Sequence, residues 1–455
     1  MALQSINPAT EEVIQNFDEL TAEQIEQKIA LTQARFESWR DTTIEERAAI
    51  MKKAAQAIRD QKAALAAIIT SEVGKTLTAS EGELEKCALT CDYYADNAAE
   101  FLAPEHIQTD GSQSYVRFDP IGIVLAVMPW NFPFWQAFRF IAPALMAGNV
   151  GLLKHASNVQ LSAAAIEKVL LDAGFPEGCF VNLAIGSAKV EAIIKDRRIK
   201  AVTLTGSEYA GSQVAKTAGE SIKKTVLELG GSDPFIVLAD ADLDQAATIA
   251  CAGRMQANAG QSCIAAKRFI VEASVAEAFT AKLTAAVEKL VVGDPTNEAT
   301  DVGPLATKQM LLDVEQQVND SVAKGATLVS GGTRLQERGY YYQPAVLSNV
   351  IKGMPVFDEE VFGPALPVIT VADAAEAVQV ANASPYGLGS TIFSSDLDKA
   401  QELARQIESG AVFINSQVKS DPRLPFGGVK QSGYGRELSH YGIKEFVNIK
   451  TVWVK

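Results

Sequence analysis

The chain carries a thiol, a carboxylate and a side-chain amide in three short motifs that lie far apart in the sequence. Cys263 ends the run Asn-Ala-Gly-Gln-Ser-Cys, Glu228 begins Glu-Leu-Gly-Gly, and Asn131 stands in Pro-Trp-Asn-Phe-Pro. A thiolate can attack an aldehyde carbonyl, and the Asn131 amide and the backbone N–H of Cys263 can stabilise the resulting oxyanion. A carboxylate can activate the water that hydrolyses a thioester. The three residues therefore predict oxidation of an aldehyde through a covalent thioester.

Each of these residues also has a purely structural interpretation. A lone cysteine is commonly a buried, inert thiol, Glu228 could be a paired or solvated carboxylate, and Asn131 could be a turn residue between prolines. Any one of these interpretations is reasonable alone. The joint occurrence of all three residues within such motifs favours chemistry.

Composition limits the class of protein that could hold this chemistry. With 455 residues the chain is too long for one small core, and 47% hydrophobic and 21% charged residues are typical of a globular protein. A net charge of −14 repels the phosphates of nucleic acids, so we expect no nucleic-acid partner. Five cysteines without a Cys-x-x-Cys pair, and three histidines, predict neither a disulfide framework nor a metal site.

No targeting or membrane segment is expected. The start has no basic region and no long apolar run, so no signal peptide is visible and a cytoplasmic location is predicted. The most apolar stretch, Val127 to Val150, contains Asn131, Gln136, Arg139 and three prolines. A bilayer would accept these residues only at high cost, so we predict a buried segment near the site and no membrane partner.

The order of predicted elements indicates an α/β fold. The first hundred residues are predicted to be helical, with capping boxes at Thr21 and Thr43. From about residue 120, apolar runs alternate with helical stretches such as 162–173 and 189–194, which is typical of parallel sheets covered on both faces. Strands are predicted at residues 121–128, 150–153, 180–183, 201–204, 235–238, 268–271, 327–330, 366–370, 390–393 and 411–414.

The three motifs match, residue by residue, signatures of the aldehyde dehydrogenase superfamily, which the chain resembles over essentially its whole length. In that family the motif cysteine is the nucleophile, the glutamate is the general base and the asparagine completes the oxyanion hole. The resemblance implies these roles for Cys263, Glu228 and Asn131. The separation between Glu228 and Cys263 is about one residue longer than usual, and we expect a loop near residues 256–257 to absorb it.

Three regions follow from the elements and from the resemblance. Residues 1–229 are expected to form a Rossmann-like cofactor-binding domain, and residues 230–424 an α/β catalytic domain. Residues 425–455 are expected to return and to end in an oligomerisation strand. This strand, 447–455, needs a partner. It could pair with residues 115–118, which would make 112–120 part of a small β oligomerisation element, or it could pair across a subunit boundary.

A further set of residues points to a nicotinamide cofactor. The apolar run 201–204 leads into a glycine pattern, and a strand followed by a helix N-terminus can bind phosphate, although a plain turn has the same pattern. In the family the matching turn contacts the pyrophosphate, and other residues contact the nicotinamide ribose and ring. The resemblance therefore implies a cofactor site that contains Trp130, Gly206, Ser207, Gly211, Leu229, Glu360 and Phe362.

Two residues favour NADP over NAD. Lys154 matches a lysine that the family uses on the adenosine ribose, and Ser157 stands where NAD-preferring members commonly carry an acid. A small hydroxyl does not repel a 2′-phosphate, and Lys154 can neutralise it. We therefore expect NADP, with NAD possible at lower preference. Alternatively, Lys154 and Ser157 are surface loop residues that give no preference between NADP and NAD. His155 stands where many relatives have proline.

Arg139 indicates the substrate. It follows Asn131 by eight residues, about two helical turns, and can hold a distal carboxylate by a bidentate pair. The branch of the family that acts on succinic semialdehyde carries an arginine at this place and a serine before Pro-Phe-Gly-Gly, here Ser420. A second arginine of some members is absent, because position 257 is Ala. Trp135 is expected to line the substrate site. Alternatively, Arg139 forms a structural salt bridge and the aromatic residues are core.

The sequence therefore predicts an NADP-preferring enzyme that converts succinic semialdehyde, a small-molecule partner, to succinate. It is most similar to a bacterial NADP-dependent branch of the family, and we expect a homodimer or homotetramer. One alternative is a broad aliphatic or amino-aldehyde dehydrogenase. A second, of a different class, is a catalytically silent binding or structural protein on this fold.

Overall fold

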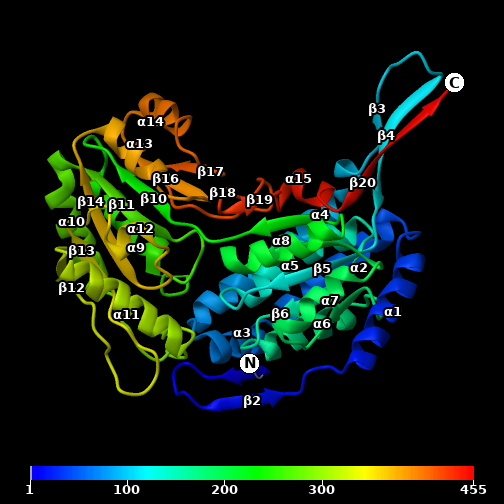
Figure 1. Cartoon of the computed structure of the whole chain (residues 1–455), viewed down its shortest axis with the longest axis horizontal. Coiled ribbons are helices and arrows are strands. Elements are labelled where there is room, and N and C mark those ends of the chain that lie inside the picture. The colour runs from blue at the N-terminus through cyan, green and yellow to red at the C-terminus, as the bar shows by residue number, and fades with distance from the viewer. Residues whose placement is uncertain (1–2, 256) are drawn as a thin grey trace.

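Two sheets, each covered by helices, form the body of the molecule, and a β arm projects from it (Figure 1). The structure is a computed structural model that describes residues 3–255 and 257–455. The predicted α/β class is confirmed. Within the described ranges, no helix is both long and apolar enough to cross a membrane.

The first sheet has six strands in the order β19-β9-β8-β5-β6-β7, and all of them except β19 run parallel. The strands are β5 (Ile123–Met128), β6 (Val150–His155), β7 (Phe180–Asn182), β8 (Ile199–Thr205), β9 (Lys224–Glu228) and β19 (Gly433–Tyr434). Nearly every residue of β5, β6 and β8 is buried, as expected for strands covered on both faces. The sequence analysis missed β9, because only Val226 and Leu227 in it are apolar.

Helices from the first half of the chain cover this sheet. They are α1 (Ala22–Trp39), α2 (Ile44–Asp60), α3 (Lys62–Val73), α4 (Leu77–Phe101), α5 (Pro133–Met146), α6 (Gln160–Asp172), the 3-10 helix η1 (Ser187–Lys189), α7 (Val190–Lys195) and α8 (Glu208–Glu220). The predicted capping boxes at Thr21 and Thr43 are present. Every residue of α5 is buried, so the apolar stretch is the predicted buried segment. A hairpin of β1 (Leu3–Ile6) and β2 (Val13–Phe17), which was not predicted, precedes these helices.

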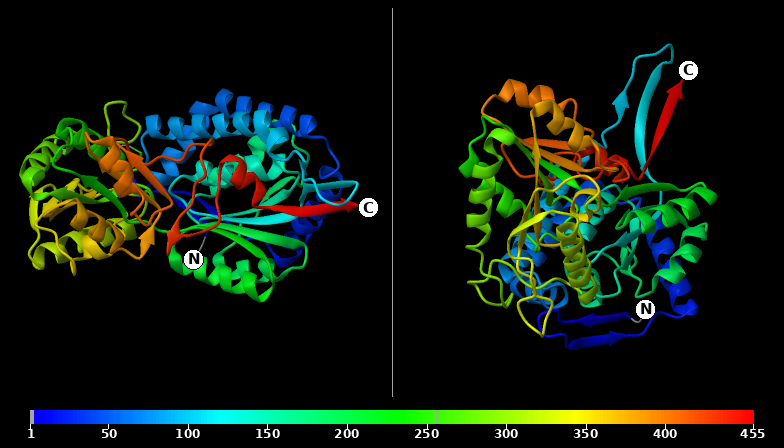
Figure 2. Two further views of the ribbon diagram at one scale, coloured as in Figure 1. Left: turned by 90° about the horizontal axis from the view of Figure 1, so that it is seen from above. Right: turned by 60° about the vertical axis from the view of Figure 1, so that its left-hand side comes forward.

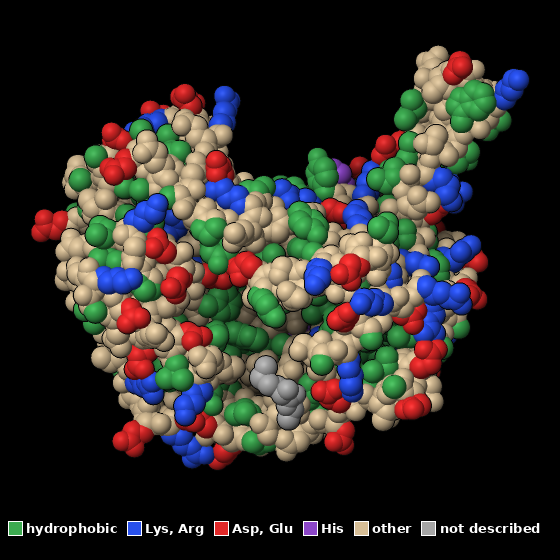
Figure 3. All heavy atoms as spheres, viewed as in Figure 1, with side chains coloured by type: hydrophobic (Ala, Val, Ile, Leu, Met, Phe, Trp, Pro, Cys, Tyr) green, Lys and Arg blue, Asp and Glu red, His purple; other side chains and the backbone are tan. Residues whose placement is uncertain are grey.

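The second sheet has seven strands in the order β12-β13-β14-β11-β10-β16-β17. They are β10 (Asp233–Val237), β11 (Ala266–Glu272), β12 (Thr327–Ser330), β13 (Ala345–Ser348), β14 (Ala365–Val371), β16 (Gly389–Phe393) and β17 (Ala411–Ile414). Its helices are α9 (Leu243–Met255), α10 (Ala273–Val287), α11 (Lys308–Ala323), α12 (Pro355–Asp358), α13 (Ala374–Asn382) and α14 (Leu397–Ala404). This sheet has a hydrophobic core of its own, and the space-filling view shows a hollow with hydrophobic side chains between the two bodies (Figure 3).

The end of the chain returns to the first body. β18 (Val429–Lys430) pairs with β15 (Tyr386–Gly387), and α15 (Ser439–Lys444) then leads to β20 (Val447–Val454). β20 runs antiparallel to β4 (Gln113–Pro120), whose other neighbour is β3 (Glu105–His106). The predicted internal pairing of the terminal strand is therefore confirmed. Both further views show this arm extending from the body (Figure 2). The division into three domains remains a prediction, although the first sheet's parallel strands end at Glu228 and the second sheet begins at Asp233.

Candidate functional site

The carboxyl edge of the six-stranded sheet gathers most of the predicted residues of the first body. Parallel strands end at a common edge, where open α/β sheets bind their ligands. After β5 come Trp130 and Asn131, Lys154 lies near the end of β6 with Ser157 after it, Gly206 and Ser207 follow β8, and β9 ends at Glu228. The fold thus brings the predicted base, amide donor and phosphate-binding turn to one edge.

The loop that carries Cys263 is bonded to this edge. Asn131 Nδ2 donates to the carbonyl oxygen of Gln261 at 3.1 Å, and Asn258 Nδ2 donates to the carbonyl oxygen of Asn131 at 2.8 Å. These bonds hold the Asn131 amide beside the chain two residues before Cys263. Since a side-chain amide carries two hydrogens, Nδ2 retains one that can serve an oxyanion.

The same loop turns sharply just before the thiol. Ala259 and Gly260 both have positive φ, 49° and 77°. A side chain at Gly260 would meet the carbonyl oxygen of Gly363 at 2.2 Å, so the close approach of backbone requires glycine there. The separation between Glu228 and Cys263 is about one residue longer than usual, and the extra residue was expected near positions 256–257. Gln256 lies outside the described residues.

The surroundings of the Cys263 thiol favour its neutral form. Burial raises its pKa to about 12, and the nearby cations of Arg139 and Lys267 act in the opposite direction. Lys267 is itself bonded to the loop, since its ammonium donates to the carbonyl oxygens of Ser262 at 2.8 Å and Cys263 at 2.7 Å. Attack on a carbonyl therefore requires a group that accepts the thiol proton.

Glu228 is a buried carboxyl with an unusual charge environment. It is 2% exposed, and within the described residues neither of its oxygens has a hydrogen-bond partner. Burial raises its pKa well above the usual range and the charge of Glu437 raises it further, whereas Arg139 and Arg436 lower it. A carboxyl whose pKa is raised can act as a general base near neutral pH.

The predicted phosphate-binding turn has the geometry that the sequence suggested. Ser207 caps α8 by accepting a hydrogen bond from the backbone N–H of Ala210 at 3.3 Å. A side chain at Gly211 would meet Leu229 Cδ2 at 2.6 Å, so glycine lets the first turns of α8 pack against the end of the first sheet. The free N–H groups and the positive dipole end of this helix suit a phosphate.

The predicted nicotinamide end of the site combines both bodies. The rings of Trp130 and Phe362 meet edge to face with centroids 5.8 Å apart. Glu360 accepts a hydrogen bond from the backbone N–H of Gly231 at 3.0 Å, and its carboxylate lies 3.2 Å from the ammonium of Lys267. Lys267 thus joins Glu360 to the backbone of the loop that carries Cys263.

Lys154 and its neighbours lie at the end of β6. Lys154 is 8% exposed, and no ion pair to it is formed in the described part of the chain. Burial lowers its pKa, against the opposing charge of Glu19. His155 is fully buried with Nε2 2.9 Å from the carbonyl oxygen of Pro133, and burial lowers its pKa to about 4. The neutral ring therefore packs and bonds at the start of α5, which explains how histidine fits where proline is common.

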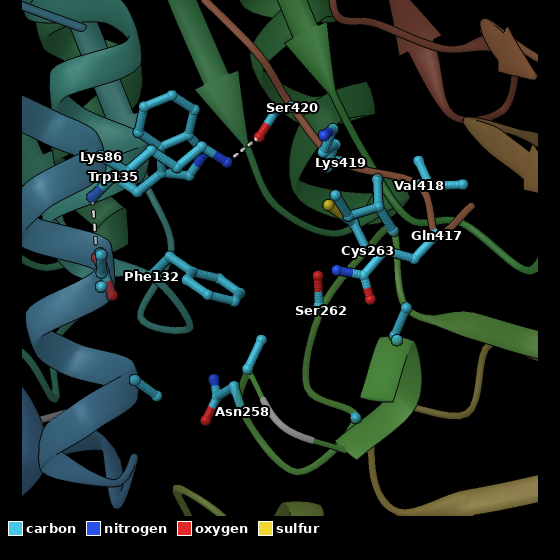
Figure 4. A pocket seen from close by; sticks show the side chains of 18 of the residues that line it. Lys86, Phe132, Trp135, Asn258, Ser262, Cys263, Gln417, Val418, Lys419 and Ser420 are labelled. Carbon is cyan, nitrogen blue, oxygen red and sulfur yellow. Dashed lines mark hydrogen bonds between the residues drawn. The ribbon is translucent and has the colours of Figure 1, made fainter. Parts of the chain in front are cut away.

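A cavity of about 350 Å³ opens on the sulfur of Cys263. Its walls include all three predicted substrate residues, Arg139, Ser420 and Trp135. In Figure 4, Trp135 and Phe132 lie on the side of α4 and α5, and Cys263 and Ser262 lie on the opposite side. Glu228 and Asn131 do not line this cavity themselves. The structure therefore brings the predicted nucleophile and the predicted substrate residues to one cavity.

Arg139 is held by protein side chains as well as lining the cavity. It is 2% exposed, it forms an ion pair with Glu437, and its Nη2 donates to Thr205 Oγ1 at 3.2 Å. Its guanidinium also lies 4.7 Å from the ring centre of Phe426. The salt bridge that was weighed as an alternative is thus present, while Arg139 still lines the cavity. Glu437 lies in the glycine-rich stretch 425–437 at the start of the return segment, and no role in the site was predicted for it.

The cavity wall also contains a lysine that sequence reasoning missed. Lys86, on α4, lines the wall and donates to Ser420 Oγ at 2.6 Å. Its ammonium lies 4.2 Å from the ring centre of Trp135. The available signal was a lysine directly beside the buried Cys87 on a helix whose neighbouring residues face a core.

Comparison with known proteins agrees with this geometry. The model of the aldehyde dehydrogenase family matches residues 1–452. A probable succinate-semialdehyde dehydrogenase [NADP(+)] of Synechocystis sp. is 52% identical over 454 residues, and a succinate-semialdehyde dehydrogenase [NADP(+)] 1 of Mycobacterium tuberculosis is 50% identical over 457 residues, each covering 100% of both chains. The crystal structure of succinic semialdehyde dehydrogenase from Streptococcus pyogenes in complex with NADP⁺ superposes with a TM-score of 0.97 at 40% identity, over 100% of both chains.

Proposed function

The chain belongs to the aldehyde dehydrogenase family, and we propose that it oxidises succinic semialdehyde to succinate with NADP⁺ as the preferred cofactor. The charge of the cavity carries this proposal. The cavity is lined by four cationic side chains, Lys86, Arg139, Arg254 and Lys419, in a protein whose net charge is −14. Glu83 also lines the cavity, but it is ion-paired with Lys75 and accepts two backbone N–H bonds at the start of α5. A local excess of cations favours an aldehyde with an anionic end.

The named activity of the relatives supports the same substrate, and the cofactor in the streptococcal structure supports NADP⁺. The cofactor site also fits this dinucleotide. The buried ammonium of Lys154 lacks an ion-pair partner among the described residues, and Ser157 adds no negative charge beside it. Such an ammonium suits a 2′-phosphate.

In the proposal, the cofactor would be held along the carboxyl edge of the first sheet. Lys154 and Ser157 would hold the adenosine ribose and its phosphate, and the turn at the start of α8 would hold the pyrophosphate. The remaining contacts would come from Trp130, Gly206, Ser207, Gly211, Leu229, Glu360 and Phe362. When bound, this cofactor supplies the acceptor for the hydrogen that leaves the substrate carbon with its electron pair.

The protein's own residues would carry the covalent steps. The thiol of Cys263 gives its proton to solvent water, its sulfur bonds to the aldehyde carbon, and the Asn131 amide donates to the carbonyl oxygen, which becomes negative. Oxidation of this adduct leaves a thioester on Cys263. Glu228 then takes a proton from water while the water oxygen attacks the thioester, which releases the carboxylate and returns the sulfur.

A broad aliphatic aldehyde dehydrogenase is the second candidate. Phe132, Trp135 and Phe426 give the cavity an aromatic lining that an unsubstituted aldehyde would also fill. The cations favour the acid over this alternative, and they disfavour cationic amino-aldehydes more strongly.

We also propose that the arm of β20 and β4 joins copies of this chain in a homodimer or homotetramer. Ile449, Trp453 and Val454 on β20 are 62%, 48% and 43% exposed, on the terminal strand of a three-stranded sheet. Such an open edge commonly pairs with another chain. A cytoplasmic location belongs to the same proposal, since all five cysteines are free, as is usual in a reducing compartment.

The test of the proposed reaction compares succinic semialdehyde with butyraldehyde, which has the same chain length but no carboxylate. We expect kcat/KM for NADPH formation to be roughly 10- to 100-fold higher for the acid, since a charge-assisted hydrogen bond contributes about 1.5–3 kcal/mol. Replacing NADP⁺ by NAD⁺ should lower kcat/KM for the acid. Cys263→Ala should abolish turnover. Equal values for the two aldehydes would leave a broad aldehyde dehydrogenase, and no turnover of either would leave a silent protein.

A further inference from the structure

We infer that the buried ion pair of Lys75 and Glu83 positions the turn that carries Asn131, and so sets the direction of the amide that stabilises the oxyanion. This inference rests on the proposed function, because it takes Asn131 as the oxyanion donor. It gives a role in the site to Lys75, which lies between α3 and α4, and to Glu83 on α4. Both act through Asn131 as positioning residues.

The ion pair lies wholly inside the protein. The side chains of Lys75 and Glu83 are both 0% exposed, and the Lys75 ammonium donates to Glu83 Oε2. Removing two charges from water costs free energy that their attraction repays only in part, so apolar residues of similar volume often replace such a pair without loss of stability. Stability alone therefore does not account for this pair, and its other contacts show what it holds.

The second oxygen of Glu83 caps α5. This helix begins at Pro133, directly after Phe132, and a phenylalanine side chain has no oxygen with which to cap the first free N–H groups. Glu83 Oε1 takes that part from α4, because it accepts hydrogen bonds from the backbone N–H groups of Phe134 and Trp135, both at 2.9 Å. Its negative charge also lies at the positive end of the helix dipole. Glu83 thereby fixes the start of α5.

Lys75 contacts the residue next to Asn131. Its ammonium lies 3.9 Å from the centre of the Phe132 ring, which is a cation–π contact inside the protein. In Figure 4, Phe132 lies on the same side of the cavity as α4 and α5. The ion pair therefore holds both the side chain of Phe132 and the first peptide groups of the helix that follows it.

The Asn131 side chain has little support of its own. Its Nδ2 donates to the carbonyl oxygen of Gln261 at 3.1 Å, and its Oδ1 is buried without a hydrogen-bond partner in the part of the chain that the structure describes. The direction of the remaining amide hydrogen thus depends on the backbone from Asn131 to Pro133, which the ion pair holds. An oxyanion donor is effective only when it is fixed before the reaction. Loss of the pair should therefore lower kcat and change KM little.

The chain contains a matched control for such a cap. Glu72, on α3, is 0% exposed and accepts hydrogen bonds from the backbone N–H groups of Leu161 at 2.8 Å and Ser162 at 2.9 Å. These are the second and third residues of α6, and Glu83 bonds the second and third residues of α5. Glu72→Gln therefore weakens an equally buried carboxylate cap at a helix that does not begin beside Asn131.

The experiment measures kcat for succinic semialdehyde and for butyraldehyde in a double-mutant cycle with Asn131→Ala. In Glu83→Gln the glutamine Nε2 faces the Lys75 ammonium, so two donors meet and the turn is displaced. We expect kcat to fall about 10-fold on both aldehydes. Asn131→Ala should cost roughly 100- to 1000-fold in the wild type, and about 10-fold less than that in Glu83→Gln, because a displaced amide contributes less. In Glu72→Gln it should cost as much as in the wild type.

A second variant separates position from stability. Lys75→Met/Glu83→Gln leaves no buried charge without its counterion, so the melting temperature should stay close to that of the wild type. We expect kcat to remain lowered, because the charged cap of α5 and the cation over the Phe132 ring are both lost. The cycle with Asn131→Ala is run in this background too, so the test holds even where Glu83→Gln alone does not fold.

The outcomes separate the inference from the proposed function. If Asn131→Ala cost as much without the ion pair as with it, or if the paired variant had the kcat of the wild type, the inference alone would be overturned. A loss confined to succinic semialdehyde would also overturn it, since Glu83 would then act on the substrate carboxylate. A wild type that oxidises neither aldehyde would contradict the proposed function.

Discussion

At the scale of single residues, the central feature is a buried pair of carboxyls that share one arginine. Glu228 and Glu437 are 2% and 5% exposed, and Arg139 lowers the pKa of both while burial raises them. One cation cannot fully compensate two buried carboxylates. The pair therefore keeps Glu228 protonated to a higher pH than an ordinary glutamate, and its charge state is tied to that of Glu437.

Glu437→Gln tests this link. The substitution removes the negative charge that raises the pKa of Glu228, and it frees Arg139 to lower that pKa. We expect the acid limb of the pH profile of kcat to move to lower pH, because a general base works only when unprotonated. The profile should be measured with butyraldehyde, which has no carboxylate to compete for the freed arginine. If the acid limb of the Glu437→Gln profile lay at the same pH as in the wild type, the charge of Glu437 would have no effect on the pKa of Glu228.

At the scale of elements, the loop before β11 is fixed by one lysine. Lys267, at the start of β11, bonds the carbonyl oxygens of Ser262 and Cys263 and pairs with Glu360, which follows α12. The position of the proposed nucleophile, Cys263, therefore depends on contacts at the predicted nicotinamide end of the site.

Lys267→Met should release this loop. We expect kcat to fall about 10- to 100-fold, since small misplacement of a reacting group can cost that much. Alkylation of Cys263 by iodoacetamide should also slow, because Lys267 is one of the two cations that lower the pKa of the thiol. As a control, Lys282→Met removes an exposed lysine paired with Asp244. If alkylation in the Lys267 variant matched that control, the lysine would not influence the thiol.

The elements also show how far sequence reasoning extends. Continuous apolar runs predicted the buried strands, and motifs singled out Cys263, Glu228 and Asn131 as candidates, because both kinds of signal are local. Lys86 and Ser420 bond across 334 positions of sequence. Their meeting, like that of Arg139 and Glu437, depends on how α4, α5 and the return segment pack. Strand β13 was missed for a local reason, since its apolar run is only Ala345-Val346-Leu347.

At the scale of the whole molecule, the arm predicts how copies of the chain associate. Ile449→Asp places a charge on an exposed apolar position of β20, and we expect the assembly to dissociate in sedimentation velocity. Asn448→Asp adds the same charge to the neighbouring residue on the opposite face of the strand, and it should change the sedimentation coefficient less. An unaltered coefficient in the Ile449 variant, or a monomeric wild type, would contradict a role of the arm in assembly.

The pairing of β4 with β20 also has a consequence for biosynthesis. Pro120 and Val447 are paired neighbours, yet roughly 330 residues separate them along the chain. At about 5–20 residues per second, a ribosome needs on the order of tens of seconds to cover that distance. Throughout this interval the eight residues of β4 lack the partner that covers one of their edges. The nascent chain is therefore most open to mispairing with its neighbours on a polysome until its last strand emerges.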